Sequence, residues 1–159
     1  DMTAEENVRQ QYMILGLPTF EGIQELLELV GLADIGKKKA KHFSFGMRQR
    51  LGIAVALAGS PDMLILDEPV NGLDPQGIIH IRELLLRINK EYGTSILISS
   101  HILDELSKIA DTIGMIDHGA MLGEISMDDI CKKGIGLEDY YLDLLGGGGK
   151  GEEPYFSGN

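Results

Sequence analysis

Two adjacent carboxylates, Asp67 and Glu68, directly follow the apolar run from Met63 to Leu66. Such a run favours a buried β-strand, and ligands of open α/β sheets bind at the carboxyl ends of the strands. Because successive side chains of a strand point to opposite faces, we expect Asp67 to hold magnesium through water and Glu68 to face a water that attacks a phosphoryl group. Alone, the pattern fits equally well an apolar strand that runs into an acidic turn.

Two more polar residues follow at spacings that predict the same edge of the sheet. Asp74 lies in the loop NGLDP, and His101 comes after a second apolar run over 95–99. A histidine at this edge can donate a hydrogen bond to a γ-phosphate oxygen and so sense a nucleoside triphosphate. By itself His101 is better explained as a helix-capping residue, but the two preceding motifs favour a functional role.

The segment FSFGMRQRLGIAVALA predicts a helix that begins with Ser44 and Gly46. The N-terminus of a helix binds anions because its first amide groups are unpaired and carry a partial positive charge. Gly46 lets the backbone approach a phosphate closely, and Ser44 adds a hydroxyl. Many helices begin with a serine that only caps them, so this segment alone also fits a structural role.

The elements that must position these residues alternate between helix and strand. A capping-box spacing of Thr3 and Glu6 begins the first helix. Periodicity and turn residues predict further helices over 21–30, from after Gln49 to about Gly59, over 76–91, around 103–110 and, as two short helices, over 127–145. They predict strands over 63–67, 95–99, 112–117 and 121–126. In the helix over 76–91 the residues expected to face inward are Ile78, Ile81, Leu85 and Ile88.

This order predicts an α/β fold with a parallel sheet and an α-helical subdomain, and the last two strands form a hairpin. We expect a helical subdomain over 1–57, a partial α/β core over 58–126, C-terminal helices over 127–145 and a disordered tail over 146–159. The tail is predicted to be disordered because it is rich in glycine and poor in apolar residues.

Composition limits the classes of partner. The 159 residues are 43% hydrophobic, which is enough for one globular unit. With 14 basic and 25 acidic residues the net charge is -11, which argues against nucleic acid and anionic lipid as partners. The lone Cys131 cannot form an internal disulfide, which fits the cytosol. The apolar runs are too short to span a bilayer, so we expect any membrane association to be through a partner.

The motifs FSFGM, LILDEP, NGLD and SSH occur in the order and at the distances of the signature, Walker B, D-loop and switch-histidine motifs of ATP-binding cassette (ABC) ATPases. The chain resembles this family over about 3–145. Its S-x-G-M signature resembles the branch of bacitracin and lantibiotic resistance exporters. The common leucine, first glycine and glutamine are replaced here by Phe43, Phe45 and Met47.

The resemblance implies the core of a P-loop NTPase that binds ATP and Mg²⁺. It implies that Asp67 positions the magnesium ion, that Glu68 polarises the attacking water and that His101 senses the γ-phosphate. The parent protein would be an ATPase that powers transport with a transmembrane permease. It would lie in the cytoplasm, on the inner face of the cell membrane, where the helical subdomain docks on the permease.

The family also pairs two ATPase subunits head to tail, with ATP between them. The resemblance implies that Ser44, Gly46 and Met47 of one subunit contact the γ-phosphate bound by the other. In the same arrangement Asp74 links the two sites across the interface.

The phosphate-binding pattern G-x-x-x-x-G-K-[ST] has no match in the chain. GLADIGKK, from Gly31 to Lys38, ends in lysine instead of a hydroxyl residue, and GGGGKG has Gly151 after its lysine. In the resembled family this loop precedes a segment like DMTAEENV, so we regard the P-loop core as incomplete. We expect the chain alone to be inactive and its sheet to have unpaired strand edges.

Two other functions share these motifs. A soluble, non-transporter ABC ATPase that acts on ribosomes or DNA would have the same acidic strand and histidine, but it needs a basic surface that the net charge disfavours. A non-catalytic fragment that docks on a permease would need only the helical subdomain.

Overall fold

The computed structural model describes residues 1–146, so the predicted tail lies outside the described residues from 147 onward. The chain consists of two compact units, Asp1–His101 and Ile102–Asn159, each of which is described by itself. Our division at 57 and 126 stays a prediction. None of the described helices is both long enough and apolar enough to cross a membrane.

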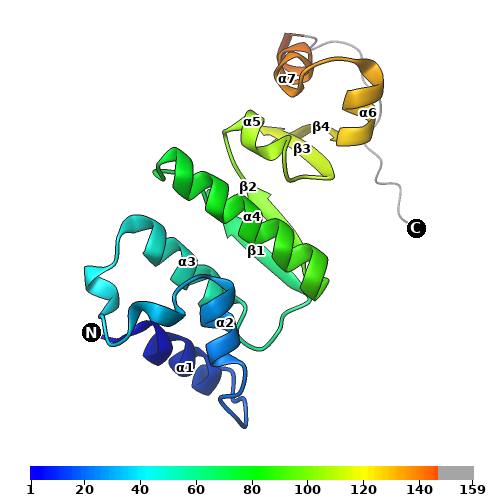
Figure 1. The fold of residues 1–159 in the computed structure, drawn as a ribbon. Coiled ribbons are helices and arrows are strands. Elements are labelled where there is room, and N and C mark those ends of the chain that lie inside the picture. The colour runs from blue at the N-terminus through cyan, green and yellow to red at the C-terminus, as the bar shows by residue number, and fades with distance from the viewer. Residues whose placement is uncertain (147–159) are drawn as a thin grey trace. The chain divides into compact units, whose positions relative to one another are not determined.

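The first unit begins with three packed α-helices and two short 3₁₀ helices (Figure 1). Their bounds are α1 Ala4–Ile14, α2 Ile23–Leu29, η1 Ala33–Ile35, η2 Ala40–His42 and α3 Phe45–Ala56. Each α-helix packs against the other two. Their shared core includes Val8, Leu27, Val30 and Ile53, each at most 4% exposed. Arg50 on α3 joins this core to the end of α2, because its Nη1 donates to the carbonyl oxygen of Val30 at 3.0 Å.

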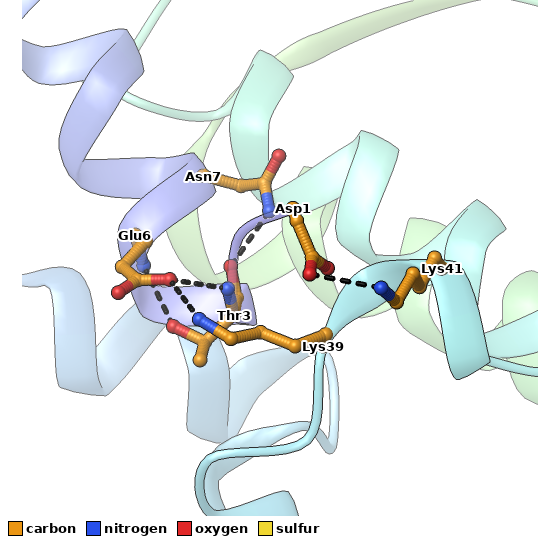
Figure 2. A network of polar contacts seen from close by, with 6 residues as sticks. All are labelled: Asp1, Thr3, Glu6, Asn7, Lys39 and Lys41. Carbon is orange, nitrogen blue, oxygen red and sulfur yellow. Dashed lines mark hydrogen bonds and ion pairs between the residues drawn. The ribbon is translucent and has the colours of Figure 1, made fainter.

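The capping box at the start of α1 is confirmed (Figure 2). The Thr3 hydroxyl accepts from the Glu6 amide at 3.2 Å, and the Thr3 amide donates to Glu6 Oε2 at 2.6 Å. Lys39 donates to the same carboxylate at 3.1 Å, and Lys41 pairs with Asp1 at 2.9 Å. The Thr3 amide, and after it Lys39, lower the pKa of the Glu6 carboxyl below its ordinary value. These contacts join the start of α1 to the segment before α3.

The second part of this unit is a parallel strand pair with a connecting helix. It consists of β1 Met63–Asp67, α4 Pro75–Tyr92 and β2 Ser95–Ser99, and the strands pair in register from Met63 opposite Ser95 to Asp67 opposite Ser99. Helix α4 packs against β2. The residues it buries are Ile81, Leu84, Leu85 and Ile88. Our assignment of Ile78 to this face was wrong in part, because it is only half-buried near the start of the helix, and Leu84 completes the face instead.

The opposite face of the strand pair is apolar and open to solvent. Ile65 is 69% exposed and Leu97, its register partner, is 54% exposed. The described residues add no third strand to this sheet. The pair therefore has one covered face and one uncovered face.

The described part of the second unit, up to residue 146, contains a hairpin and three helices. Their bounds are α5 Leu103–Leu106, β3 Thr112–Asp117, β4 Ala120–Ser126, α6 Met127–Lys133 and α7 Leu137–Gly146. The predicted hairpin is confirmed, and its turn residues His118 and Gly119 have φ angles of 46° and 79°, as a tight two-residue turn between twisted strands requires. Helix α5 ends earlier than we predicted. The unit has its own core, formed by Ile113, Met115, Ile125, Ile130 and Leu137.

Candidate functional site

The carboxyl ends of β1 and β2 lie side by side and bring the acidic residues next to a serine. Asp67 and Ser99 are register partners, and the Ser99 hydroxyl donates to Asp67 Oδ1 at 2.5 Å. The same hydroxyl accepts from the Glu68 amide at 3.0 Å, and the Ser99 carbonyl oxygen accepts from that amide at 3.2 Å. Ser99 is thus bonded to both residues of the acidic pair.

Glu68 does not continue the strand. The strand ends at Asp67, and Glu68 has a φ of 48°, in the left-handed region. Our argument from strand alternation was therefore wrong for Glu68, because alternation holds only in extended backbone. A non-glycine residue adopts this conformation at a cost of roughly 1–2 kcal/mol. The two hydrogen bonds of its amide to Ser99 offset this cost.

Glu68 and His101 are in direct contact, as expected for residues at one edge of the sheet. His101 Nδ1 lies 2.8 Å from Glu68 Oε1. The other carboxylate oxygen, Glu68 Oε2, is buried and has no hydrogen-bond partner among the described residues. A buried, unpaired acceptor gains free energy from any donor that reaches it, including a water molecule. This oxygen fits the role of holding a water.

The contact also restricts the protonation of His101. An ionised carboxylate only accepts hydrogen bonds, so Nδ1 is the donor when Glu68 is charged. A neutral ring then has a lone pair at Nε2, whereas a doubly protonated ring donates from both nitrogens. Donation to a phosphate while Nδ1 stays bonded to Glu68 requires the doubly protonated ring. The side chain of His101 is 65% exposed, which leaves it accessible to a ligand.

The other predicted residues line a separate open groove of about 390 Å³. Ser44, Gly46, Met47 and Asp74 all contribute to it, and Asp67, Glu68 and His101 do not. Of the four residues expected at one sheet edge, the structure joins Asp67, Glu68 and His101 through hydrogen bonds to one another or to Ser99. The fourth, Asp74, lies in the groove at the start of α3.

Two of the groove residues have structural roles as helix caps. The Ser44 hydroxyl accepts from the Met47 amide at 3.2 Å and caps α3. Asp74 Oδ1 accepts from the Gly77 amide at 3.2 Å and caps α4. The N-termini of two helices thus border one groove, and both caps are side chains that the sequence singled out for function.

The start of α3 packs on the loop before α4 through an aromatic ring. A Cβ atom on Gly72 would lie 3.6 Å from the Phe45 ring, and one on Gly46 would lie 3.6 Å from Leu73. Gly72 has a φ of 75°, which suits glycine. The Arg48 guanidinium lies 5.9 Å from the centre of the Phe45 ring. Phe45, which the sequence marked only as a departure from the common signature, connects the two parts of the groove.

Sequence reasoning did not identify Ser99 as part of the site. The available signal was its position, since the last residue of one parallel strand lies opposite the last residue of the next when the strands are in register. In this chain that places a hydroxyl opposite Asp67.

The described residues contain no group of three His, Cys, Asp or Glu side chains placed to hold a metal ion. Magnesium sites that act on phosphates commonly use only one or two carboxylates, together with waters and the phosphates of the substrate. Asp67 fits such a site as a single carboxylate, because its Oδ1 accepts a hydrogen bond from Ser99 while its Oδ2 has no hydrogen bond to another described residue.

A family model described as "ABC transporter" matches residues 1–71. The chain belongs to the ATP-binding cassette family of transporter ATPases. A solved structure of an ATP-binding subunit of an ABC transporter superposes with a TM-score of 0.73 at 31% identity, over 91% of this chain and 63% of that one. The predicted α/β fold of an ABC ATPase core is thereby confirmed.

Among curated proteins, the chain is 54% identical over 145 residues to the uncharacterized ABC transporter ATP-binding protein YcbN of Bacillus subtilis, covering 91% of this chain and 46% of YcbN. It is 47% identical to the bacitracin transport ATP-binding protein BcrA of Bacillus licheniformis, over 84% of this chain and 44% of BcrA. It is 46% identical to the lantibiotic transport ATP-binding protein SrtF of Streptococcus pyogenes, over 80% of this chain and 55% of SrtF. The chain spans about half the length of these relatives, and the predicted resemblance to the bacitracin and lantibiotic branch is confirmed.

Proposed function

We propose that this chain is part of an ATP-hydrolysing subunit that powers transport of a peptide antibiotic across a membrane. The observation that supports this most directly is the Glu68–His101 pair, in which one carboxylate oxygen is bonded to the ring and the other is buried with no partner in the described part of the chain. In such a carboxylate one oxygen is held in place and the other is free to accept a hydrogen bond, and then a proton, from water. It can therefore act as a general base.

In this proposal the residues at the end of β1 act on ATP and Mg²⁺. Bound magnesium would neutralise charge on the β- and γ-phosphates. Asp67 holds that ion through its free oxygen, Glu68 orients and polarises the attacking water, and His101, with both ring nitrogens protonated, donates to a γ-phosphate oxygen from Nε2. Each of these roles uses an atom that the hydrogen bonds within the site leave available.

The groove at the start of α3 acts on the nucleotide of a second subunit. This is supported by its lining, which contains Ser44, Gly46 and Met47 but none of the residues at the end of β1. Two copies placed head to tail would bring the groove of one to the carboxylates of the other. In that dimer the helix N-terminus at Gly46 faces a phosphate, and Asp74 lies at the contact between the two sites.

The partner is a transmembrane permease, and the subunit lies on the cytoplasmic face of the membrane. The proteins BcrA and SrtF are described as transport ATP-binding proteins for bacitracin and for a lantibiotic. In this arrangement the permease supplies the passage across the membrane. The helical part of the first unit would dock on it.

The test is ATP hydrolysis by the full-length protein in which this sequence occurs. Glu68→Gln keeps the size of the side chain but removes the base, so we expect the rate to fall about 10²- to 10⁴-fold while ATP still binds. The matched control is Glu83→Gln, which changes an exposed residue of α4 and should leave the rate unchanged. An unchanged rate for Glu68→Gln would contradict the proposal.

A second arm uses the 159-residue chain alone. It has no G-x-x-x-x-G-K-[ST] pattern, and we expect neither micromolar binding of ATP nor turnover. Clear hydrolysis by this chain would contradict this expectation, because ATP would then be held without that pattern.

A further inference from the structure

We propose that Ser99 is a positioning residue of this site, whose hydroxyl sets the orientation of the Asp67 carboxylate and holds the backbone turn that presents Glu68 to His101. The inference rests on the proposed function, because it assigns Asp67 to the metal and Glu68 to the water. Ser99 is the last residue of β2, whereas Asp67 is the last residue of β1 and Glu68 follows it.

The direction of each hydrogen bond of Ser99 is fixed by its partner. The backbone amide of Glu68 can only donate, so the hydroxyl oxygen accepts from it at 3.0 Å. An ionised Asp67 can only accept, so the hydroxyl proton points to its Oδ1 at 2.5 Å. A hydroxyl that accepts and donates at once is a stronger donor than one that only donates. One group thus connects the amide of Glu68 to the carboxylate of Asp67.

The bond to Asp67 leaves one of the two carboxylate oxygens for a metal. Without the hydroxyl, the carboxylate of this exposed residue can rotate, and its two oxygens compete for solvent. Ordering a flexible side chain upon ligand binding costs free energy, which a side chain that is already held does not incur. Ser99 is therefore expected to increase affinity for the metal without touching it.

The bond to the Glu68 amide acts on the water-binding carboxylate through the backbone. Glu68 has a left-handed φ of 48°, and its amide is held by both the hydroxyl and the carbonyl oxygen of Ser99. This turn directs the side chain toward His101, with Oε1 2.8 Å from the ring Nδ1, instead of toward the face of the sheet that it would meet in a continued strand. Loss of the hydroxyl removes one of the two bonds that hold the turn.

If Ser99 served only the pairing of β1 with β2, its hydroxyl would not matter more than that of another serine on β2. The pairing of β1 with β2 extends over five register pairs, from Met63 opposite Ser95 to Asp67 opposite Ser99. Ser95 is at the other end of the same strand and lies opposite an apolar residue. Ser95→Ala is therefore the matched control, since it removes an exposed hydroxyl of β2 that has no carboxylate opposite it.

The experiment compares Ser99→Val with Ser99→Thr in the full-length protein. The two side chains have the same shape and both suit a strand, but only threonine keeps the hydroxyl. Mn²⁺ replaces Mg²⁺ as the probe, and its binding is measured by electron paramagnetic resonance in the presence of a non-hydrolysable ATP analogue. The Mg²⁺ concentration that gives half-maximal hydrolysis is measured in parallel.

We expect Ser99→Val to weaken Mn²⁺ binding about threefold to tenfold, the effect of losing one hydrogen bond, and to raise the required Mg²⁺ concentration by the same factor. We expect Ser99→Thr to stay within about twofold of the unsubstituted protein, because its hydroxyl is retained. Ser99→Ala, which removes the hydroxyl without adding volume, should match Ser99→Val. It also serves if valine prevents folding.

Equal Mn²⁺ affinity for the valine, alanine and unsubstituted proteins would overturn the proposal. So would a loss shared by Ser99→Thr or by the Ser95→Ala control, since the hydroxyl would then not be the cause. If the unsubstituted protein bound no Mn²⁺ with the nucleotide, the proposed function would fail and the role of Ser99 would fail with it. Normal binding that is insensitive to Ser99 would overturn only the role of Ser99.

Discussion

Asp74 has one role in the structure and a second in the proposed dimer, and a pair of substitutions can separate them. In the structure it caps α4, because its Oδ1 accepts from the Gly77 amide at 3.2 Å. In the proposed dimer the same side chain lies where two sites meet. Asp74→Ala removes both roles, whereas Asp74→Asn keeps an acceptor oxygen and removes only the charge.

The size of the effect follows from the helix that Asp74 begins. Pro75 is the first residue of this 18-residue helix and has no amide hydrogen, so the cap serves one of the few free donors of the first turn. Loss of an N-cap acceptor costs about 1 kcal/mol, and asparagine is as good a cap as aspartate. We therefore expect Asp74→Ala to be destabilised by about 1 kcal/mol and Asp74→Asn by less than half of that.

The assay is thermal unfolding of this chain, followed by the far-ultraviolet circular dichroism of its helices. In a unit of about 100 residues, 1 kcal/mol lowers the midpoint by about 4–8 °C. The matched control is Asp62→Ala, which removes another exposed aspartate that caps no helix. Equal losses for alanine and asparagine would refute the capping argument, because the charge would then be responsible. In the full-length protein, a stable Asp74→Asn variant with slow hydrolysis would support the link between sites.

Two further predictions concern the stability of the first unit. Ile88 on α4 is 0% exposed, so Ile88→Ala should lower the free energy of unfolding, measured in urea, by about 2–5 kcal/mol. Leu86 on the same helix is 43% exposed, and Leu86→Ala should lower it far less. Similar losses of stability for the two variants would contradict the burial of Ile88. The lowered pKa of Glu6 means that its stabilising contribution is present above the ordinary value of 4.5 and is lost as pH falls through the lower folded value. Glu6→Gln should therefore flatten the dependence of the unfolding midpoint on pH in this acid range, while the exposed control Glu21→Gln should leave the dependence unchanged; parallel curves for Glu6→Gln and the unsubstituted chain would count against it.

Features that depend on nearby residues could be predicted from the sequence. The capping box needs only the spacing of Thr3 and Glu6, and the hairpin needs only two alternating runs and the pair His118 and Gly119. The placement of Glu68 and His101 at one edge of the sheet could also be predicted, because residues at the ends of adjacent parallel strands meet there, and the structure shows the two side chains in contact.

Features that depend on exact register or backbone angles could not. The left-handed turn at Glu68 is invisible in the residue types, since glutamate rarely adopts it. The hydroxyl of Ser99 bonds to a residue 32 positions away and only in one register. Helix α4 buries Leu84 where periodicity predicted Ile78. The residues that a helix buries against a sheet depend on packing as well as on periodicity.

On the uncovered apolar face of the strand pair, Ile65 and Leu97 affect the solubility of this chain and the stability of an assembly in opposite ways. In this chain both side chains are mostly in water, so a polar replacement there removes a source of aggregation at little cost to stability. In any assembly that covers the face, each of them would contribute about 1.5–3 kcal/mol by burial, and the same replacement would forfeit that contribution. Selecting variants of this chain for solubility would thus enrich substitutions that weaken such an assembly.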